Sequence, residues 1–107
     1  MAKNIVAAGI SDRCTIQLAY AIGVSEPLSV YVNNHDTNHV DDTGMADIIR
    51  EMVKLSPRGI RERLQLNRPI YKKTSSFGHF GREPEDDGHF SWERLDLVPE
   101  LKRAFNI

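Results

Sequence analysis

Apolar and polar residues alternate in two short runs between positions 16 and 32, and alternation at every second residue is the period of a β-strand with one apolar face. The first run carries Ile16, Leu18, Tyr20 and Ile22, and the second carries Leu28, Val30 and Val32. Between them Gly23 suits a turn, and Pro27 cannot donate to a strand ladder, so the second strand should begin after Pro27. The pattern predicts a β-hairpin with a five-residue loop over positions 23–27.

The other face of the first predicted strand carries the small residues Ala19 and Ala21. A surface this flat would let another backbone or a flat ligand approach closely. Small side chains occur equally in ordinary, tightly packed sheets, so both interpretations stand.

A different periodicity, with apolar residues three and four positions apart, predicts a helix over residues 45–53. Its apolar stripe consists of Met45, Ile48, Ile49, Met52 and Val53. We expect Asp42 or Thr43 to cap this helix, and Asp47 to lie in its early turns, where the helix dipole favours an acidic side chain. The stripe can pack on the hairpin, so the predicted fold class is α+β: a small sheet built on a hairpin, with helices on one face.

Two shorter helices are predicted toward the C-terminus. Ser56 and Pro57 suit the N-cap and first position of a helix that runs to about Leu64 and buries Ile60 and Leu64. Another helix should begin near Pro99, where Leu97, Val98, Leu101 and Phe105 form its apolar side.

Residues 2–8 also have a helical composition, and Gly9 suits the left-handed position just past a helix end. No capping residue precedes Ala2, and the helix is shorter than the roughly 12 to 15 residues that marginal stability in water requires. We therefore expect that Met1 stands within a longer natural helix, truncated here, and that the helix is frayed through about Asn4.

Residues 67–83 mix aromatic residues with glycines and show no sustained period, so this segment should be irregular and held by its aromatic side chains. Residues 85–88 (Glu-Asp-Asp-Gly) predict an acidic surface turn, after which Phe90 and Trp92 should return to the body of the domain.

Length and charge limit the function classes. The chain has 107 residues, which is one domain with a modest core, and a formal net charge of -1, which recruits neither nucleic acid nor an anionic membrane. No apolar run approaches the roughly 20 residues of a membrane span, and the first ten residues do not resemble a signal peptide. The single Cys14 is expected to be a small buried hydrophobe, and we expect a cytoplasmic protein.

Two groups of side chains invite a site interpretation. His35 and His39 are four residues apart in the polar stretch 33–42, a spacing that brings two imidazoles together on a helix. The density of Asn, Asp and Thr there favours turns instead, so we do not predict a metal site. Three arginines of the predicted helix 57–64 could hold phosphate, but Glu62 lies among them and we favour a solvated face. They are Arg58, Arg61 and Arg63.

No phosphate-binding loop, dinucleotide fingerprint, Cys pair or serine elbow is present. His79 has the chemistry of an acid or base, although a histidine that hydrogen-bonds the backbone of an irregular loop is the favoured interpretation. The residues by themselves indicate a non-catalytic piece.

Several blocks nevertheless resemble the C-terminal domain of S-adenosylmethionine synthetase (methionine adenosyltransferase), in the family's order and over nearly the whole chain. They are residues 2–9 (AKNIVAAG), 12–14 (DRC), 20–24 (YAIGV), 26–27 (EP), 68–71 (RPIY), 78–82 (GHFGR) and 92–93 (WE). Residues 84–89 look like an insertion, and Ser91 stands where the family has a proline. These departures affect only the expected local path of the chain near its C-terminal end.

The resemblance implies an enzyme that joins methionine to ATP. In the family the methionine sulfur attacks the ribose C5′, and the triphosphate leaves and is cleaved to pyrophosphate and phosphate, with Mg²⁺ and K⁺ assisting. The family's catalytic histidine, lysines and metal-binding aspartates lie in segments before this chain. The resemblance therefore implies that residues 1–107 alone are inactive and bind no metal.

The resemblance also implies one contact within this chain. Ile22 is similar to the residue that packs on the adenine ring opposite a phenylalanine from another part of the enzyme; the alternative is that Ile22 closes the hairpin core. The family fold implies three similar α+β domains about a pseudo-threefold axis, and active sites between the subunits of a homodimer or homotetramer. Its partners are ATP, L-methionine and the remaining domains.

Two other function classes compete with this interpretation. One is a stand-alone, non-catalytic α+β module that binds a protein partner through its sheet face or edge. The other is a nucleic-acid module built on the arginines of residues 58–63, which the neutral charge balance disfavours.

Overall fold

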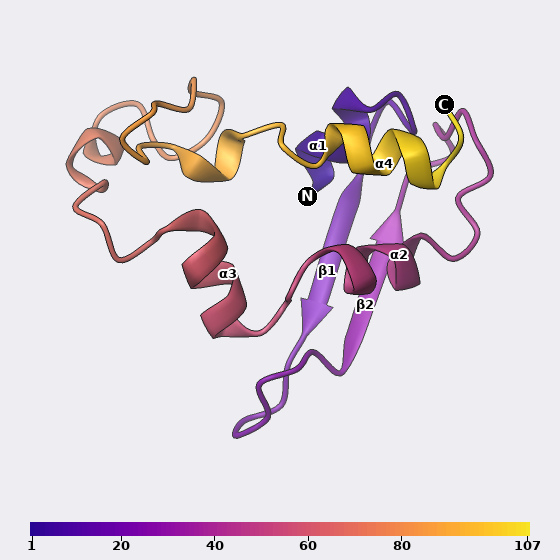
Figure 1. Ribbon diagram of the computed structural model, residues 1–107, viewed down its shortest axis with the longest axis horizontal. Coiled ribbons are helices and arrows are strands. Elements are labelled where there is room, and N and C mark those ends of the chain that lie inside the picture. The colour runs from indigo at the N-terminus through magenta and orange to yellow at the C-terminus, as the bar shows by residue number, and fades with distance from the viewer. The chain divides into compact units, whose positions relative to one another are not determined.

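The computed structural model describes all residues, 1–107, and divides them into two compact units. One, which we call the helix–hairpin unit, consists of Met1–Ser56 and Leu95–Ile107. The other is the Pro57–Arg94 unit. The elements in chain order are α1 (Ala2–Ala7), β1 (Thr15–Ala19), β2 (Ser29–Asn33), α2 (Met45–Met52), α3 (Pro57–Leu64), the 3-10 helices Lys72–Ser75 and Ser91–Glu93, and α4 (Val98–Ala104) (Figure 1).

The predicted hairpin is present, and its two antiparallel strands form the whole sheet. Ile16 pairs with Val32 and Leu18 with Val30, so the alternating apolar residues of both strands share one face. That face packs on the buried core, while Gln17 and Tyr31 on the opposite face are exposed. An isolated two-stranded hairpin is marginal in water, so the helical layer supplies the stability of this sheet.

The core lies between the hairpin and three helices. Its nine buried apolar residues come from α1, α2, α4 and the segments next to them: Ile5, Ala8, Ile10, Met45, Ile49, Val53, Leu55, Leu97 and Leu101. In Figure 1, α1 lies beside α4 and α2 crosses the hairpin, in agreement with the contacts of α1 with α4 and of α2 with β2. The predicted α+β class, with helices on one face of a hairpin, is confirmed.

The loop of the hairpin is longer than the five residues predicted. The ladder ends at the pair Ala19 and Ser29, so residues 20–28 form the connection. Tyr20 and Ile22 continue the apolar alternation of β1, but Ile22 has no partner strand opposite it. Leu28 is 65% exposed and does not join the apolar face. Alternation alone cannot show where two strands diverge.

Helix α1 is tied down more firmly than its sequence suggests. Gly9 has φ 83 and occupies the predicted left-handed position after the helix. Asn4 is buried, and its side-chain oxygen accepts a hydrogen bond from the Leu97 backbone N–H at 3.1 Å. This contact joins α1 to the start of α4 and so anchors the helix at Asn4; fraying of the helix start, which amide exchange would measure, stays a prediction.

Helix α2 ends at Met52, one residue short of the predicted range 45–53, and carries Asp47 in its first turn, but its cap differs from the prediction. Gly44, at φ 77, is the N-cap residue, and no side chain caps the helix. The Asp41 carboxylate instead accepts hydrogen bonds from the backbone N–H and the hydroxyl of Thr43, which forms a turn before the helix. Neither Asp42 nor Thr43 is therefore the cap.

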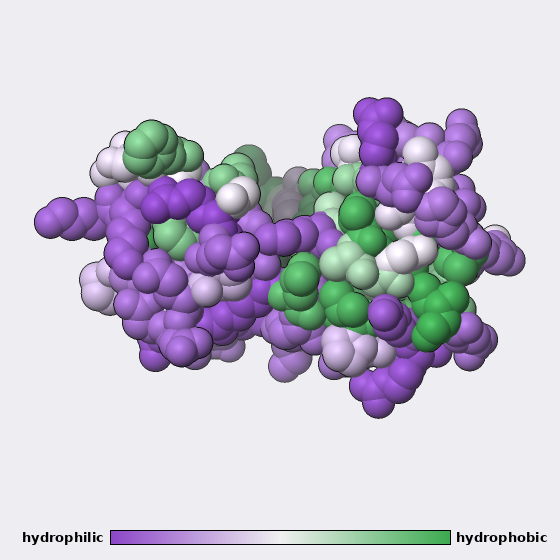
Figure 2. All heavy atoms as spheres, turned by 90° about the horizontal axis from the view of Figure 1, so that it is seen from above, coloured by the Kyte–Doolittle hydropathy of each residue, from purple (hydrophilic) through white to green (hydrophobic).

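The Pro57–Arg94 unit contains α3 at the predicted bounds and then irregular chain with two 3-10 helices. Ile60 and Leu64, which the helix was predicted to bury, are only partly buried. Phe90 is buried, but Phe77 is 96% and Phe80 79% exposed, so the aromatic side chains hold this segment only in part. The left part of Figure 2, which holds this unit, is mostly hydrophilic with isolated apolar side chains.

Candidate functional site

The end of the hairpin, residues 20–28, presents apolar side chains to solvent. Ile22 is fully exposed, with a relative accessibility of 106%, and Val24 is 50% exposed. The alternative in which Ile22 closes the hairpin core is therefore wrong for this structure. A fully exposed isoleucine lacks the hydrophobic stabilisation of about 1.5 to 3 kcal/mol that burial would provide, and its side chain is open to a contact from outside the domain.

A tight turn places Ile22 at the outer corner of this loop. The Val24 N–H donates to the Ala21 carbonyl at 3.1 Å, which closes a four-residue turn with Ile22 and Gly23 at its centre. Gly23 has φ 82. Positive φ at the third residue of such a turn is the type II pattern, which favours glycine there. Gly23 thus allows the chain to reverse immediately after Ile22.

Two hydrogen bonds hold the base of the loop. The Leu28 N–H donates to the Ala19 carbonyl at 2.7 Å, just beyond the last ladder pair. The Tyr20 hydroxyl donates to the Leu55 carbonyl oxygen at 2.6 Å and so connects the loop to the segment after α2. The alternation of apolar residues does not predict this second bond. The available signal was a tyrosine on the apolar face of a strand, since a partly buried tyrosine hydroxyl usually finds a partner.

A second exposed apolar loop, residues 76–81, lies in the Pro57–Arg94 unit. Arg82 donates to the carbonyl oxygens of Ser76 at 2.7 Å and Lys73 at 3.2 Å, and its guanidinium carbon lies 4.4 Å from the centre of the Phe90 ring. The Trp92 indole N–H donates to the His79 carbonyl oxygen at 2.7 Å. These side chains thus hold the backbone of the loop through its carbonyl groups.

His79 lies on the surface of the Pro57–Arg94 unit. The bond from Trp92 involves the His79 main chain, and the imidazole makes no hydrogen bond within the chain, so the favoured backbone-bonding interpretation is wrong. The ring instead lies near two aromatic rings, with centroids 6.2 Å from Phe80 and 6.4 Å from Trp92.

The polar stretch after β2 forms turns, as predicted, and its histidines point to separate partners. His39 Nε2 lies 2.7 Å from a carboxylate oxygen of Asp12, and His35 Nε2 lies 2.8 Å from the Thr15 hydroxyl. No group of three or more His, Cys, Asp or Glu side chains is placed to hold a metal ion. The spacing of the two histidines therefore has no metal-binding geometry here.

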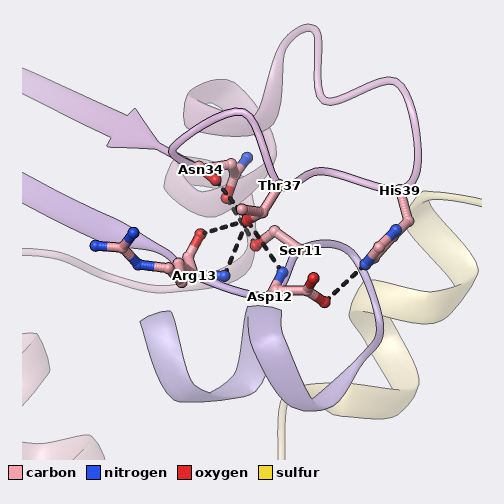
Figure 3. A network of polar contacts seen from close by, with 6 residues as sticks. All are labelled: Ser11, Asp12, Arg13, Asn34, Thr37 and His39. Carbon is pink, nitrogen blue, oxygen red and sulfur yellow. Dashed lines mark hydrogen bonds and ion pairs between the residues drawn. The ribbon is translucent and has the colours of Figure 1, made fainter.

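Thr37 is the centre of a hydrogen-bond network that joins the two ends of the hairpin (Figure 3). Its hydroxyl oxygen accepts the backbone N–H groups of Asp12 at 3.2 Å and Arg13 at 3.0 Å, and the hydroxyl donates to the Asn34 carbonyl at 2.7 Å. The Ser11 hydroxyl donates to the Asn34 side chain at 2.9 Å. These contacts are structural, because they satisfy main-chain groups of the strand entry and exit.

Cys14 and the α3 arginines behave as surface or packing residues. Cys14 is partly buried against the core, and burial raises the pKa of its thiol. A raised pKa lowers the thiolate fraction and hence the reactivity of the thiol. Arg58, Arg61 and Arg63 are all exposed, in agreement with a solvated face. No helix of the structure has the length and apolar character needed to cross a membrane.

These features define a small α+β domain that exposes an apolar turn at the end of its hairpin. The family profile described as the C-terminal domain of S-adenosylmethionine synthetase matches residues 1–94. The chain belongs to this family. The two competing classes, a stand-alone interaction module and a nucleic-acid module, give way to this assignment.

Individual relatives agree with the family assignment. The chain is 61% identical over 105 residues to an S-adenosylmethionine synthase of Rhodospirillum centenum, covering 98% of this chain and 27% of the relative. It is 62% identical over 107 residues to the S-adenosylmethionine synthase of Acidiphilium cryptum, with the same coverage of 98% and 27%. The chain thus spans 27% of the length of these curated relatives.

A solved structure extends the comparison to the fold. An unusual S-adenosylmethionine synthetase from Campylobacter jejuni superposes with a TM-score of 0.83 and 36% identity, covering 95% of this chain and 27% of that chain. The sequence and structure comparisons therefore agree on the family of this domain.

Proposed function

We propose that this chain acts as the C-terminal domain of an S-adenosylmethionine synthase, which makes S-adenosylmethionine from ATP and L-methionine and releases phosphate and pyrophosphate. Within that enzyme the domain serves assembly, and Ile22 forms one wall of the adenine site. Family membership supports the enzyme class. The single observation that carries the adenine contact is the full exposure of Ile22, at 106%, on a turn that projects it from the domain.

The chemistry of the proposed reaction agrees with this division of roles. Sulfur attack on the ribose C5′ expels a triphosphate, so cationic groups must stabilise the leaving group. The described side chains do not converge on a cation site. In our proposal the Mg²⁺ and K⁺ of the reaction, and the groups that hold the triphosphate, belong to parts of the enzyme outside residues 1–107. Ile22 contributes only apolar contact with the flat face of the base.

The remaining parts of the proposal follow from the family. The complete enzyme is a cytoplasmic homodimer or homotetramer, in which this domain is one of three similar domains and the active site lies between subunits. Coverage of 27% of each relative supports the view that most of the enzyme lies outside this chain.

The adenine contact is tested by Ile22→Ala in the complete enzyme. Loss of an aliphatic wall should weaken ATP affinity by about 1 to 2 kcal/mol, or roughly 5- to 30-fold. The melting temperature should hardly change, because the side chain is exposed. ATP binding by calorimetry and thermal melts measure both quantities.

The matched control is Leu18→Ala, which shortens an aliphatic side chain that packs against the core from β1, four residues before Ile22. It should lower stability by about 2 to 5 kcal/mol and leave ATP affinity of the folded enzyme unchanged. If Ile22→Ala melts as early as Leu18→Ala and binds ATP normally, the adenine contact is refuted.

The division of roles is tested with residues 1–107 alone. We expect no S-adenosylmethionine and no triphosphate hydrolysis above background with ATP, methionine, magnesium and potassium. Product formation by this chain would require a catalytic site within it and would overturn the proposed assignment of roles.

A further inference from the structure

We propose that Tyr20 is the positioning residue of the adenine-facing turn. Its hydroxyl ties the first residue of the loop to the main chain of Leu55 and so determines where Ile22 stands. This inference rests on the proposed adenine contact of Ile22, and the experiments below separate the two.

Tyr20 lies just past the point where the hydrogen-bond ladder of the sheet ends. Strand β1 ends at Ala19, so Tyr20 is the first residue beyond the ladder and lies two positions before Ile22. Its hydroxyl donates to the Leu55 carbonyl oxygen at 2.6 Å, across 35 residues of sequence. Leu55 is 2% exposed and belongs to the core cluster, so it is a fixed point on the helical layer.

The other hydrogen bonds of the loop are local. The Val24 N–H bonds to Ala21, and the Leu28 N–H bonds to Ala19. The first shapes the turn and the second closes the base of the loop, but neither connects the loop to the helical layer. Pro27 is buried, so packing holds the later half of the loop. Among these bonds, the Tyr20 hydroxyl alone ties the half that carries Ile22 to a residue of the core.

The environment of Tyr20 suits a positioning role rather than a core role. The side chain is 40% exposed, so its ring contributes less burial than the core residues do. A net hydrogen bond contributes about 0.5 to 1.5 kcal/mol, which is small for global stability. It is sufficient to bias a nine-residue connection, 20–28, toward one arrangement, and displacement by about 1 Å of a substrate-positioning group can change a rate up to 100-fold.

The test is Tyr20→Phe in the complete enzyme, because this change removes only the hydroxyl. We expect the KM for ATP to rise about 3- to 10-fold, which corresponds to the net worth of one hydrogen bond. The KM for methionine and the hydrolysis of tripolyphosphate, which carries no adenine, should stay unchanged. Tyr31→Phe is the matched control, since Tyr31 is 56% exposed on the opposite face of the hairpin and its hydroxyl makes no hydrogen bond within the chain.

A double variant decides whether Tyr20 acts through Ile22. If it does, Tyr20→Phe combined with Ile22→Ala should raise the KM for ATP no further than Ile22→Ala alone, because coupled sites are not additive. Additive effects would overturn the inference. So would an unchanged KM for ATP in Tyr20→Phe, or equal losses in all activities together with a lower melting temperature.

The failures of the two proposals are distinguishable. If Ile22→Ala leaves the KM for ATP unchanged, the adenine contact itself fails, and the positioning role fails with it. If Ile22→Ala raises the KM for ATP and Tyr20→Phe does not, only the positioning role is refuted.

Discussion

The two units of the chain are stabilised in different ways. The helix–hairpin unit buries nine apolar residues in one cluster. The Pro57–Arg94 unit buries only Ile70 and Phe90 among its apolar residues, together with the polar residues Thr74, Ser91 and Glu93. The first unit therefore depends on apolar burial, and the second depends more on hydrogen bonds from side chains to the main chain.

Those hydrogen bonds join parts of the Pro57–Arg94 unit that lie far apart in sequence. The Ser91 hydroxyl donates to the Leu64 carbonyl at 2.6 Å, and the Gly81 N–H donates to the Glu93 carboxylate at 2.8 Å. Each such bond stabilises by about 0.5 to 1.5 kcal/mol and costs more when one partner is removed. The comparison shows that a unit with a small apolar core can still have a defined backbone path, set by particular side chains.

The largest effect should come from the core of the helix–hairpin unit. Ile10 is 0% exposed, and Ile10→Ala should destabilise the protein by about 2 to 5 kcal/mol through lost burial and a residual cavity. Chemical unfolding measures this loss. Ile22→Ala makes the same chemical change at a side chain that is 106% exposed, and should cost less than about 0.5 kcal/mol. Equal losses would show that apolar burial does not dominate this unit.

A smaller effect is expected for Arg82 in the Pro57–Arg94 unit. Arg82→Leu keeps an apolar stem but removes the bonds to the Ser76 and Lys73 carbonyls and the contact with the Phe90 ring. We expect a loss of about 1 to 3 kcal/mol, seen as faster amide exchange over residues 72–93. Arg61→Leu on the exposed side of α3 is the control and should leave this exchange unchanged. Normal protection in Arg82→Leu would contradict a hydrogen-bonded basis for this unit.

The smallest effect is a pH dependence that both units should share. A hydrogen bond from the His89 side chain lowers the pKa of Asp87, and hydrogen bonds from Thr43 lower the pKa of Asp41 in the helix–hairpin unit. Because each pKa is lower in the folded state, the stabilisation is complete above the ordinary aspartate value of about 3.9 and is lost as the pH falls through the folded value. Both groups are exposed, so the effect is small.

Unfolding midpoints of Asp87→Asn and Asp41→Asn at neutral pH and near pH 3 would test this sign. The unsubstituted protein should lose slightly more stability on acidification than either variant. A variant that loses more than the unsubstituted protein would show that the carboxylate is not stabilised in its ionised form.

The sequence predicted the helix–hairpin unit better than the Pro57–Arg94 unit, for a physical reason. Apolar periodicity reports which face of an element is buried, and it correctly paired Ile16 and Leu18 with Val30 and Val32 on one face. Irregular chain has no such period. Its aromatic residues were therefore treated alike, although Phe90 is buried and Phe77 is 96% exposed.

The sequence also did not predict the N-cap of α2 or the hydrogen bond that anchors α1. Asp41, Asp42 and Thr43 all have side chains that could cap α2, and the choice of Gly44 depends on how the preceding turn enters the helix. The anchoring role of Asn4 could not be predicted, because its side chain accepts a hydrogen bond from Leu97, which is 93 residues away in sequence. Local pattern carries no information on such partners.

The sequence by itself determined the hairpin and its apolar face, the helices α2 and α3 and, through its motifs, the family. Only the tertiary structure decided that β1 stops at Ala19, that Ile22 stands fully exposed on a turn, and that Tyr20 reaches the Leu55 carbonyl. The reason is that alternation is a property of one strand, whereas the end of a ladder and the partner of a hydroxyl depend on a second segment brought close by folding. The candidate site needs both kinds of information, because the motif identifies Ile22 and only the fold shows that its side chain is exposed.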